Sequence, residues 1–287
     1  MTRVRGVGVR TGWGEGVAAL PADAVASSHG RRVIALARPA LDGDRFRRAT
    51  RECLLGVVAV EAMLRDAGLT RDVLSGSRTA LVYVTAAAYG ASNRLFVGAD
   101  GASPARTEGG LIKEGSGSVR PGGGTLHFPY TAPSAVPAEL AIEYSLRGGY
   151  VILVGGATAA IDALWQASTL LTSGRAERAL VLAVETFAEC EDLWARGRWA
   201  ARGPLVEAAA CALLDGAGDL AYGAVEEAAP LETLAARRAG ETLACGPLIG
   251  LGLAREAGAA EARLTGHWRG RRTTVTLALC ESRAPAH

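Results

Sequence analysis

The sequence has few of the residues that carry acid–base or metal chemistry. Of its 287 residues only four are histidine and five are cysteine. The cysteines are scattered, odd in number and never spaced as CxxC, which argues against a disulfide framework and against a zinc site. Such cysteines are typical of buried thiols in a reducing compartment. We therefore expect a cytoplasmic protein without a bound metal.

Long apolar runs and an excess of charge are also missing. No stretch approaches the roughly 18 uncharged apolar residues that a membrane-spanning helix needs, and the first residues lack the continuous apolar stretch of a signal peptide. The net charge is only +2, with charged residues at 21%. A dedicated nucleic-acid binder needs a strong basic excess for its phosphate contacts. We expect neither a membrane nor a nucleic acid as a partner.

A complete nucleotide-binding loop is absent as well. Residues 4–12 read VRGVGVRTG, in which Gly6 and Gly8 begin a GxGxxG pattern, but Thr11 stands at the third glycine position. That glycine is the one that close packing of helix on strand requires. The P-loop and GxSxG motifs do not occur either. We expect no cofactor.

Small apolar residues are what the sequence has in quantity. Apolar residues make up 49% and aromatic residues only 5%, so the core must be built from Ala, Val and Leu. Strand-like and helix-like segments alternate, which favours an α/β architecture. The run YVILV at residues 150–154 is apolar enough to be a fully buried strand, and residues 96–124 read as a long loop. The other strands are predicted at 4–9, 79–85, 179–184, 208–214 and 273–279, and helices at 45–67, 135–146, 158–172 and 243–254.

The segment from Phe128 to Leu164 resembles the N-terminal half of β-ketoacyl synthases, the condensing enzymes of the thiolase fold. In that family FPNT-PN, LRGP, a buried strand and the TACSSGL-A nucleophile turn follow one another along the chain. The corresponding segments occur here in the same order: FPYTAPS, LRGG, the strand YVILV and the turn GGATAAIDAL. Further family elements resemble three other parts of the chain: the first strand, the helix that ends in DAGL, and the segment SGRAERALVLAVET. The resemblance covers about residues 1–225.

The resemblance implies a thiolase-like α/β fold with the layers α-β-α-β-α. Its N-terminal half would be complete over residues 1–225. Its C-terminal half, residues 226–287, would be shortened and packed on the first half as one structural unit.

Three positions that the family uses in catalysis hold other residues here. Ala157 stands at the place of the catalytic cysteine, and a methyl group cannot form an acyl thioester. The family's EAHGTGT loop falls on VEEAAPLETL, residues 225–234, which has no histidine. Pro247 follows Gly246 where the family has Gly-His, and its ring offers neither donor nor acceptor. The resemblance therefore implies a pseudoenzyme with no catalytic residues.

A condensing-enzyme subunit that lacks these groups is similar to a chain-length factor of type II polyketide synthases, most of all to the shortened forms of polyene systems. This implies a heterodimer with a catalytic ketosynthase, and contact with an acyl carrier protein through that complex. The expected interface strand consists of Val151, Ile152, Leu153 and Val154. The candidates for closing the partner's acyl tunnel are Phe128, Tyr130, Ser134 and Glu139.

Alternatives remain open for several of these residues. Phe128 and Tyr130 could fill this chain's own core, and Glu139 could be a solvated or partner-paired carboxylate. A stand-alone enzyme with altered chemistry, a malonyl-carrier decarboxylase or an acyltransferase, is the alternative function. Cys245 could then be a displaced nucleophile, although no histidine lies nearby in the sequence to lower its pKa.

Overall fold

The structure is a computed structural model that describes residues 2–47, 49–89, 131–188, 191 and 203–280. The loop predicted at 96–124 and the candidates Phe128 and Tyr130 lie outside these residues. Within the described part of the chain, none of the helices has both the length and the apolar character needed to cross a membrane.

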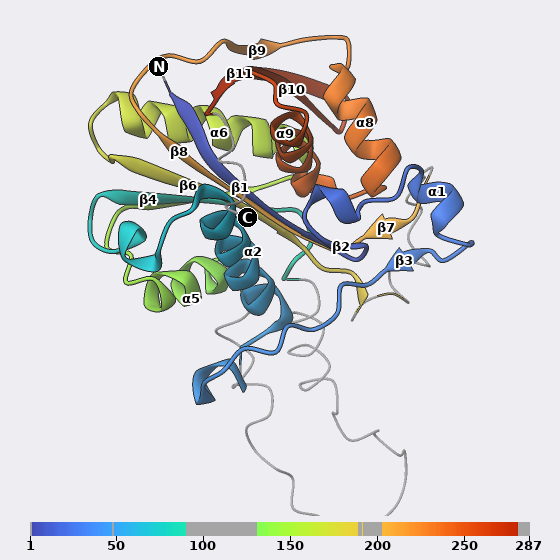
Figure 1. The fold of residues 1–287 in the computed structure, drawn as a ribbon, viewed down its shortest axis with the longest axis horizontal. Coiled ribbons are helices and arrows are strands. Elements are labelled where there is room, and N and C mark those ends of the chain that lie inside the picture. Colours follow the sequence, from blue (N-terminus) through green and yellow to red (C-terminus); the bar gives the residue numbers. More distant parts are fainter. Residues whose placement is uncertain (1, 48, 90–130, 189–190, 192–202, 281–287) are drawn as a thin grey trace, which may run out of the picture.

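The strands join in one mixed sheet in the order β10–β11–β1–β8–β6–β4–β5 (Figure 1). Strands β1, β4, β5 and β6 run parallel, and β8 runs opposite to both of its neighbours. The β1–β11 join is short, with only Arg3 paired to Ala278 and Val4 to Leu279. The bounds are β1 Arg3–Thr11, β4 Thr79–Thr85, β5 Tyr150–Val154, β6 Arg178–Glu185, β8 Ala208–Asp215, β10 Glu261–Trp268 and β11 Arg271–Leu279.

Two short strands extend the sheet and two form a separate pair. The added strands are β2 (Gly14–Glu15), which pairs with β1, and β9 (Tyr222–Ala224), which pairs with β11. The separate pair is β3 (Val33–Ile34) with β7 (Leu205–Val206).

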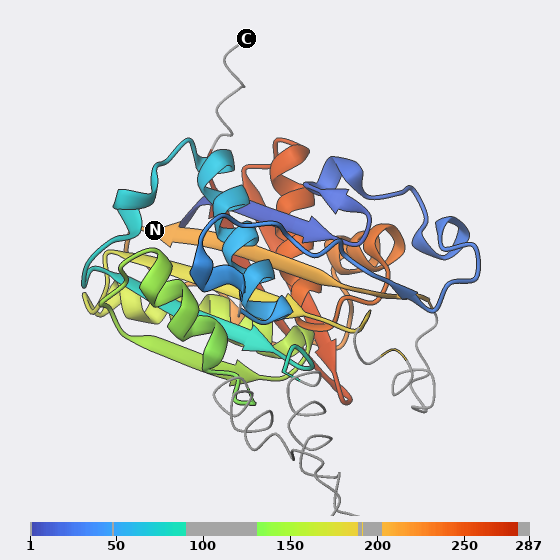
Figure 2. The ribbon, with the colours of Figure 1, turned by 90° about the horizontal axis from the view of Figure 1, so that it is seen from below.

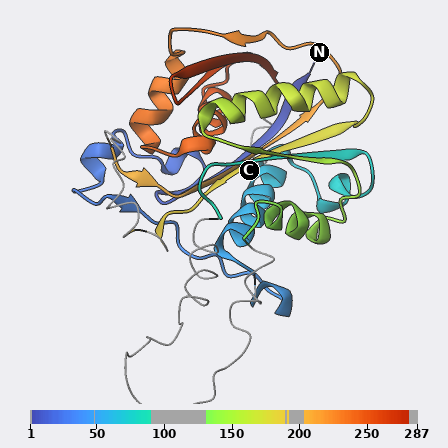
Figure 3. The ribbon, with the colours of Figure 1, turned by 180° about the vertical axis from the view of Figure 1, so that it is seen from behind.

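Helices cover both faces of the β1–β8–β6–β4–β5 part of the sheet. Helices α2 (Arg51–Ala67) and α5 (Ala135–Glu143) pack on one face, as Figure 2 shows. Helices α6 (Ala157–Thr172) and α9 (Gly246–Glu256) pack on the other. The β10–β11 hairpin lies across α6 and α9 on their far side (Figure 3). The layers are therefore helix, sheet, helix, sheet, with α6 and α9 in the middle.

The chain after residue 225 contributes few elements. They are α8 (Pro230–Ala239), which packs along α9, then α9 itself and the β10–β11 hairpin. The short helix α1 (Ala24–Ser27) rests against α8.

Two predicted helices begin later than the periodicity indicated, and one ends earlier. Residues 45–67 divide into a 3-10 turn at Asp44–Arg47 and α2, which ends at Gly68 in the left-handed conformation (φ 63°) that glycine adopts without strain. Residues 243–254 likewise begin with a 3-10 turn at Leu243–Cys245. Helix α5 ends at Glu143, because Ser145 turns to a positive φ.

The prediction of a fully buried strand at residues 150–154 is wrong. Strand β5 lies at the end of the strand order and pairs with β4 alone among the described strands. The side chains of Tyr150 and Val154 expose 60% and 59% of their surface.

Candidate functional site

The turn between β5 and α6 holds the first candidate position. Strand β5 ends at Val154, Gly155 and Gly156 follow, and α6 begins with Ala157. We call Gly155–Ala157 the elbow. Its first amide donates to the carbonyl of Thr85 at the end of β4 (3.0 Å), so the elbow sits at the carboxyl ends of the parallel strands, where α/β proteins place their sites.

Strand β10 lies directly against the elbow. A Cβ added at Gly156 would overlap the indole ring of Trp268, and one added at Gly266 would overlap the carbonyl oxygen of Ala157. Only glycine fits at these two points of contact. The space beside Ala157 is thus bounded by β10 of the same chain.

The second candidate position lies at the start of the neighbouring helix. Pro247 occupies the first turn of α9 and is buried. The described histidine nearest to the elbow in sequence is His267 on β10. It alternates with Gly266 and Trp268, which face the elbow, so it points to the opposite face and is exposed.

Cys245 does not have the surroundings of a nucleophile. Its thiol is fully buried and lies 3.4 Å from the carbonyl oxygen of Ala208. Burial, together with the nearby charge of Glu185, raises the pKa of this thiol well above its ordinary value. A thiol that stays protonated is a poor nucleophile.

Two buried carboxylates near the elbow were not predicted from the sequence. Glu185 ends β6 and accepts hydrogen bonds from the amides of Ala86 (2.8 Å), Ala87 (2.8 Å) and Ala244 (3.3 Å). Burial raises the pKa of Glu185 to about 8, while these amides oppose the shift. Glu185 thereby joins the loop after β4 to the turn before α9.

The neighbouring carboxylate has a similar role. Glu207 precedes β8, accepts from the amides of Phe187 (2.8 Å), Ala188 (2.7 Å) and Leu36 (2.8 Å), and pairs with the Arg51 guanidinium. Both buried glutamates have a signal in the sequence that could have pointed to them. It is a single acidic residue at the end of an apolar run, as in LVLAVE, which ends at Glu185.

The four residues expected at an interface lie on the last strand of the sheet, as far as the structure describes the chain. Strand β5, which contains them, is flanked along the chain by α5 and α6. Exposed apolar side chains gather on these three elements: Ile142 (62%) on α5, Tyr150 and Val154 on β5, and Trp165 (40%) on α6. The Trp165 ring stacks on Tyr222 at 5.0 Å between ring centroids.

Two of the four tunnel candidates, Ser134 and Glu139, lie among the described residues, at the start of α5 and within it. Ser134 precedes α5 and is half-buried. Glu139 is buried and pairs with Arg45 (2.9 Å) within the chain, so it is not a solvated carboxylate.

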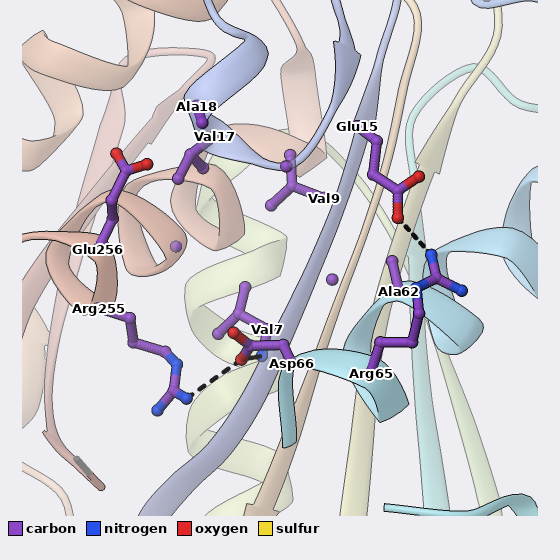
Figure 4. A pocket seen from close by; sticks show the side chains of 13 residues that line it. Val7, Val9, Glu15, Val17, Ala18, Ala62, Arg65, Asp66, Arg255 and Glu256 are labelled. Carbon is purple, nitrogen blue, oxygen red and sulfur yellow. Dashed lines mark hydrogen bonds and ion pairs between the residues drawn. The ribbon is translucent and has the colours of Figure 1, made fainter. Parts of the chain in front are cut away.

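A cavity of about 390 Å³ lies elsewhere, at the edge of β1 between α2 and the last turns of α9 (Figure 4). Asp66 accepts from the amide of Val7 (2.8 Å) and pairs with Arg255 (3.1 Å), and Arg65 pairs with Glu15. Strands β8, β6 and β4 separate β1 from the elbow side of the sheet. The cavity is therefore not part of the candidate site.

Comparison with known protein families identifies the family of this chain. Residues 29–212, more than half of the chain, match the family described as the N-terminal domain of β-ketoacyl synthase. No curated protein matches the chain in sequence.

Solved structures show the same fold at low identity. A type II polyketide acyl-carrier protein complex with its ketosynthase superposes with a TM-score of 0.72 at 14% identity, over 97% of this chain and 99% of that chain. The ishigamide ketosynthase/chain length factor gives 0.66 at 17% identity, with coverages of 97% and 99%. A β-ketoacyl synthase from Burkholderia phymatum gives 0.65 at 14% identity, with coverages of 96% and 98%. The fold is thiolase-like, as expected.

Proposed function

The chain belongs to the β-ketoacyl synthase family, and we propose that within this family it is a non-catalytic chain-length factor. It forms a heterodimer with a catalytic ketosynthase and shapes the acyl tunnel of that partner in type II polyketide biosynthesis of the polyene kind. An acyl carrier protein serves the pair through the ketosynthase. Residues 1–225 act as the ketosynthase-like half and residues 226–287 as its reduced counterpart.

One observation supports the proposal: among the described strands, the apolar strand β5 ends the sheet and pairs on one side only. Val151 and Leu153 pack toward α6, Ile152 packs toward α5, and Tyr150 and Val154 remain exposed. An exposed apolar edge strand is a template for pairing with another chain and an aggregation hazard when it stays unpaired. A ketosynthase of the same fold presents an equivalent strand, so two such edges join into one continuous sheet.

The residues at the elbow support a non-catalytic role. Ala157 has no nucleophilic atom, and Pro247 at the start of α9 has no side-chain hydrogen-bond group. A stand-alone decarboxylase or acyltransferase would need a replacement nucleophile, and burial keeps Cys245 protonated. In the heterodimer, Ser134 and the preceding Phe128 and Tyr130 are the residues proposed to face the partner's tunnel.

The pairing is tested with charge substitutions at two equally exposed valines. Val154→Asp places a carboxylate in the proposed interface, where an unpaired charge costs several kcal/mol. Val25→Asp places the same charge on α1, where Val25 is exposed to a similar degree (58%). Tagged versions of both variants are co-expressed with a catalytic ketosynthase of the type II polyketide kind, and co-elution is measured by size-exclusion chromatography.

We expect the Val25→Asp variant to co-elute with the ketosynthase and the Val154→Asp variant to elute alone. Circular dichroism of both proteins verifies that each is folded. Undiminished co-elution of the Val154→Asp variant would overturn the assignment of β5 as the interface.

A further inference from the structure

A second cavity, of about 350 Å³, lies where β1 ends and turns into β2. We call it the turn cavity. Its lining comes from this turn, from the chain after β3 and from α2, and combines apolar with charged side chains: Trp13, Leu36, Pro39 and Val58 are apolar, and Arg10, Arg38 and Glu15 are charged. Strands β8, β6 and β4 lie between β1 and β5, so this cavity is separate from the elbow and from the proposed interface.

Positive charge exceeds negative charge at the turn cavity. Glu15 is the one carboxylate among the described residues that line it, and it pairs with both Arg10 (2.6 Å) and Arg65 (Figure 4). The Nε of Arg10 is buried without a hydrogen-bond partner among the described residues. Arg38 makes no ion pair within the part of the chain that the structure describes, and its guanidinium donates to the carbonyl of Ala49 (3.0 Å). A single carboxylate thus faces three guanidinium groups.

The walls of the turn cavity are held in place by hydrogen bonds to the rest of the chain. The amide of Leu36 donates to Glu207 (2.8 Å), and its carbonyl accepts from Arg51, which itself pairs with Glu207. On the other side, the indole N–H of Trp13 donates to the carbonyl of Ala239 (2.9 Å). The cavity is therefore preformed, and a ligand can bind without the cost of ordering a loop.

We propose that the turn cavity binds a small organic anion, with a carboxylate or phosphate group on an apolar body. A guanidinium offers parallel N–H donors in one plane, which match two oxygens of a carboxylate or phosphate. Arg38 uses one of its five donors for Ala49 and points the proposal to its remaining ones. The excess of positive charge favours an anion over a neutral molecule of the same shape.

The apolar part of the lining sets the size of the ligand. Leu36, Pro39 and Val58 offer carbon surface beside the guanidinium groups. The volume is near the lower end of the roughly 300–1,000 Å³ of ligand pockets, so the apolar body is a single ring or a short branched chain. This inference goes beyond the proposed function, because it needs neither a partner subunit nor the elbow.

Three probes that share one aromatic ring separate recognition of charge from recognition of shape. Benzoate carries a carboxylate, phenyl phosphate carries a phosphate, and benzamide has a neutral amide in place of the carboxylate. Each is titrated into the full-length protein, without any partner, by isothermal titration calorimetry at low ionic strength, where charge interactions are least screened.

We expect at least one of the two anions to bind, and benzamide to bind more weakly than that anion by about tenfold or more. The anion that binds more tightly identifies the head group as carboxylate or phosphate. Benzamide that binds as tightly as the anions, or no binding of either anion at millimolar concentration, would overturn the proposal.

Variants of exposed arginines locate the binding site. Arg38→Gln should weaken binding of the anion by about tenfold or more, and Arg38→Lys, which keeps the charge without the planar donors, should give an intermediate affinity. Arg32→Gln removes the same charge from an exposed arginine just before β3 that does not line the cavity. This control should change the affinity less than about twofold.

Circular dichroism verifies that each of these variants keeps the wild-type fold. Equal affinities of the Arg38→Gln and Arg32→Gln variants for the anion would show that it binds elsewhere and would overturn the assignment. Because the titrations contain no ketosynthase, their outcome is independent of the Val154→Asp experiment.

Discussion

At the scale of single residues, the two buried glutamates show how an apolar sheet fixes its loops. Strands β6 and β8 consist mainly of alanine, valine and leucine, and each has a carboxylate at the same end. Backbone amides of other segments point at these carboxylates. A buried carboxylate that accepts several amide hydrogen bonds compensates part of its lost hydration. Glu185 and Glu207 thereby hold the segments that surround the elbow.

Glu185 should make the stability of the protein depend on pH. Its pKa is about 8 in the folded protein and 4.5 in an unfolded chain. Between these values the folded state holds a proton that the unfolded state has lost, so the free energy of unfolding falls as pH rises. The contribution is complete below pH 4.5 and is lost as the pH rises through 8, with a slope of at most about 1.4 kcal/mol per unit.

Urea unfolding at pH 5, 6, 7 and 8 measures this slope. Glu185→Gln keeps the shape of the side chain and removes the titration, so the decline between pH 5 and pH 8 should be smaller in the variant. An identical decline in both proteins would show that other groups cause it.

At the scale of elements, the junction between β1 and β11 is held mainly by side chains. The ladder between them stops after two residue pairs. Arg255 then donates to the carbonyl of Cys280 (3.0 Å) and that of Val4 (3.3 Å), and Asp66 accepts from the amide of Val7. Side chains from α9 and α2 thus take over the hydrogen bonds that a longer strand would supply, which protects the edge of β1 from other chains.

Replacing Arg255 should therefore destabilise the protein strongly. Arg255→Met leaves Asp66 without its cation and two carbonyls without a donor, and we expect a loss of about 3 kcal/mol. Arg65→Met removes the ion pair between Arg65 and Glu15 at the same cavity. Both of these side chains are exposed, so the loss should be less than about 1 kcal/mol. Chemical denaturation of the two variants provides the comparison, and equal losses would contradict this account.

The elements that the sequence predicted well are those with an unambiguous pattern. The apolar run at Thr79–Thr85 forms β4 with the predicted bounds, and the periodic helix before Gly68 ends where the glycine indicated. Strand β10 was missed although EARL alternates polar and apolar residues, because the glycine and histidine that follow interrupt the pattern. Helix α8 was missed because alanine and arginine give it only a weak apolar face.

The site was predictable only in part, for physical reasons. The turn before Ala157 follows from a strand, two glycines and a helix in succession. The contact of Trp268 with Gly156 joins residues more than a hundred positions apart, and no local pattern encodes it. An apolar run also does not distinguish a central strand from an edge strand that a partner covers, so the burial predicted for β5 was wrong for this chain on its own.

At the scale of the whole molecule, the β10–β11 hairpin has one apolar and one polar face. The inner face of the β10–β11 hairpin is apolar, with Leu264 and Val275 buried against the middle helices. The outer face carries Arg263, which is exposed, and the half-buried Thr274 and Thr276. A sheet with one apolar and one polar face is stable with solvent on the polar side. The hairpin therefore packs with its apolar face on the middle helices and its polar face outward.

This arrangement predicts that one substitution cannot create a condensing enzyme. Ala157→Cys restores a thiol at the start of α6, where the helix dipole favours the thiolate. Condensation also requires groups that stabilise the enolate formed on decarboxylation. Pro247 cannot supply one, residues 225–234 contain no histidine, and His267 points away from the elbow.

The test pairs the Ala157→Cys variant with a ketosynthase whose own nucleophile has been replaced by alanine. Incubation with acyl carrier protein loaded with malonyl units should give no extended product by mass spectrometry, while wild-type ketosynthase in the same complex does. Extension by the Ala157→Cys complex would mean that other side chains of this chain stabilise the enolate. The loss of activity would then lie in Ala157 alone, and the rest of the site would still be intact.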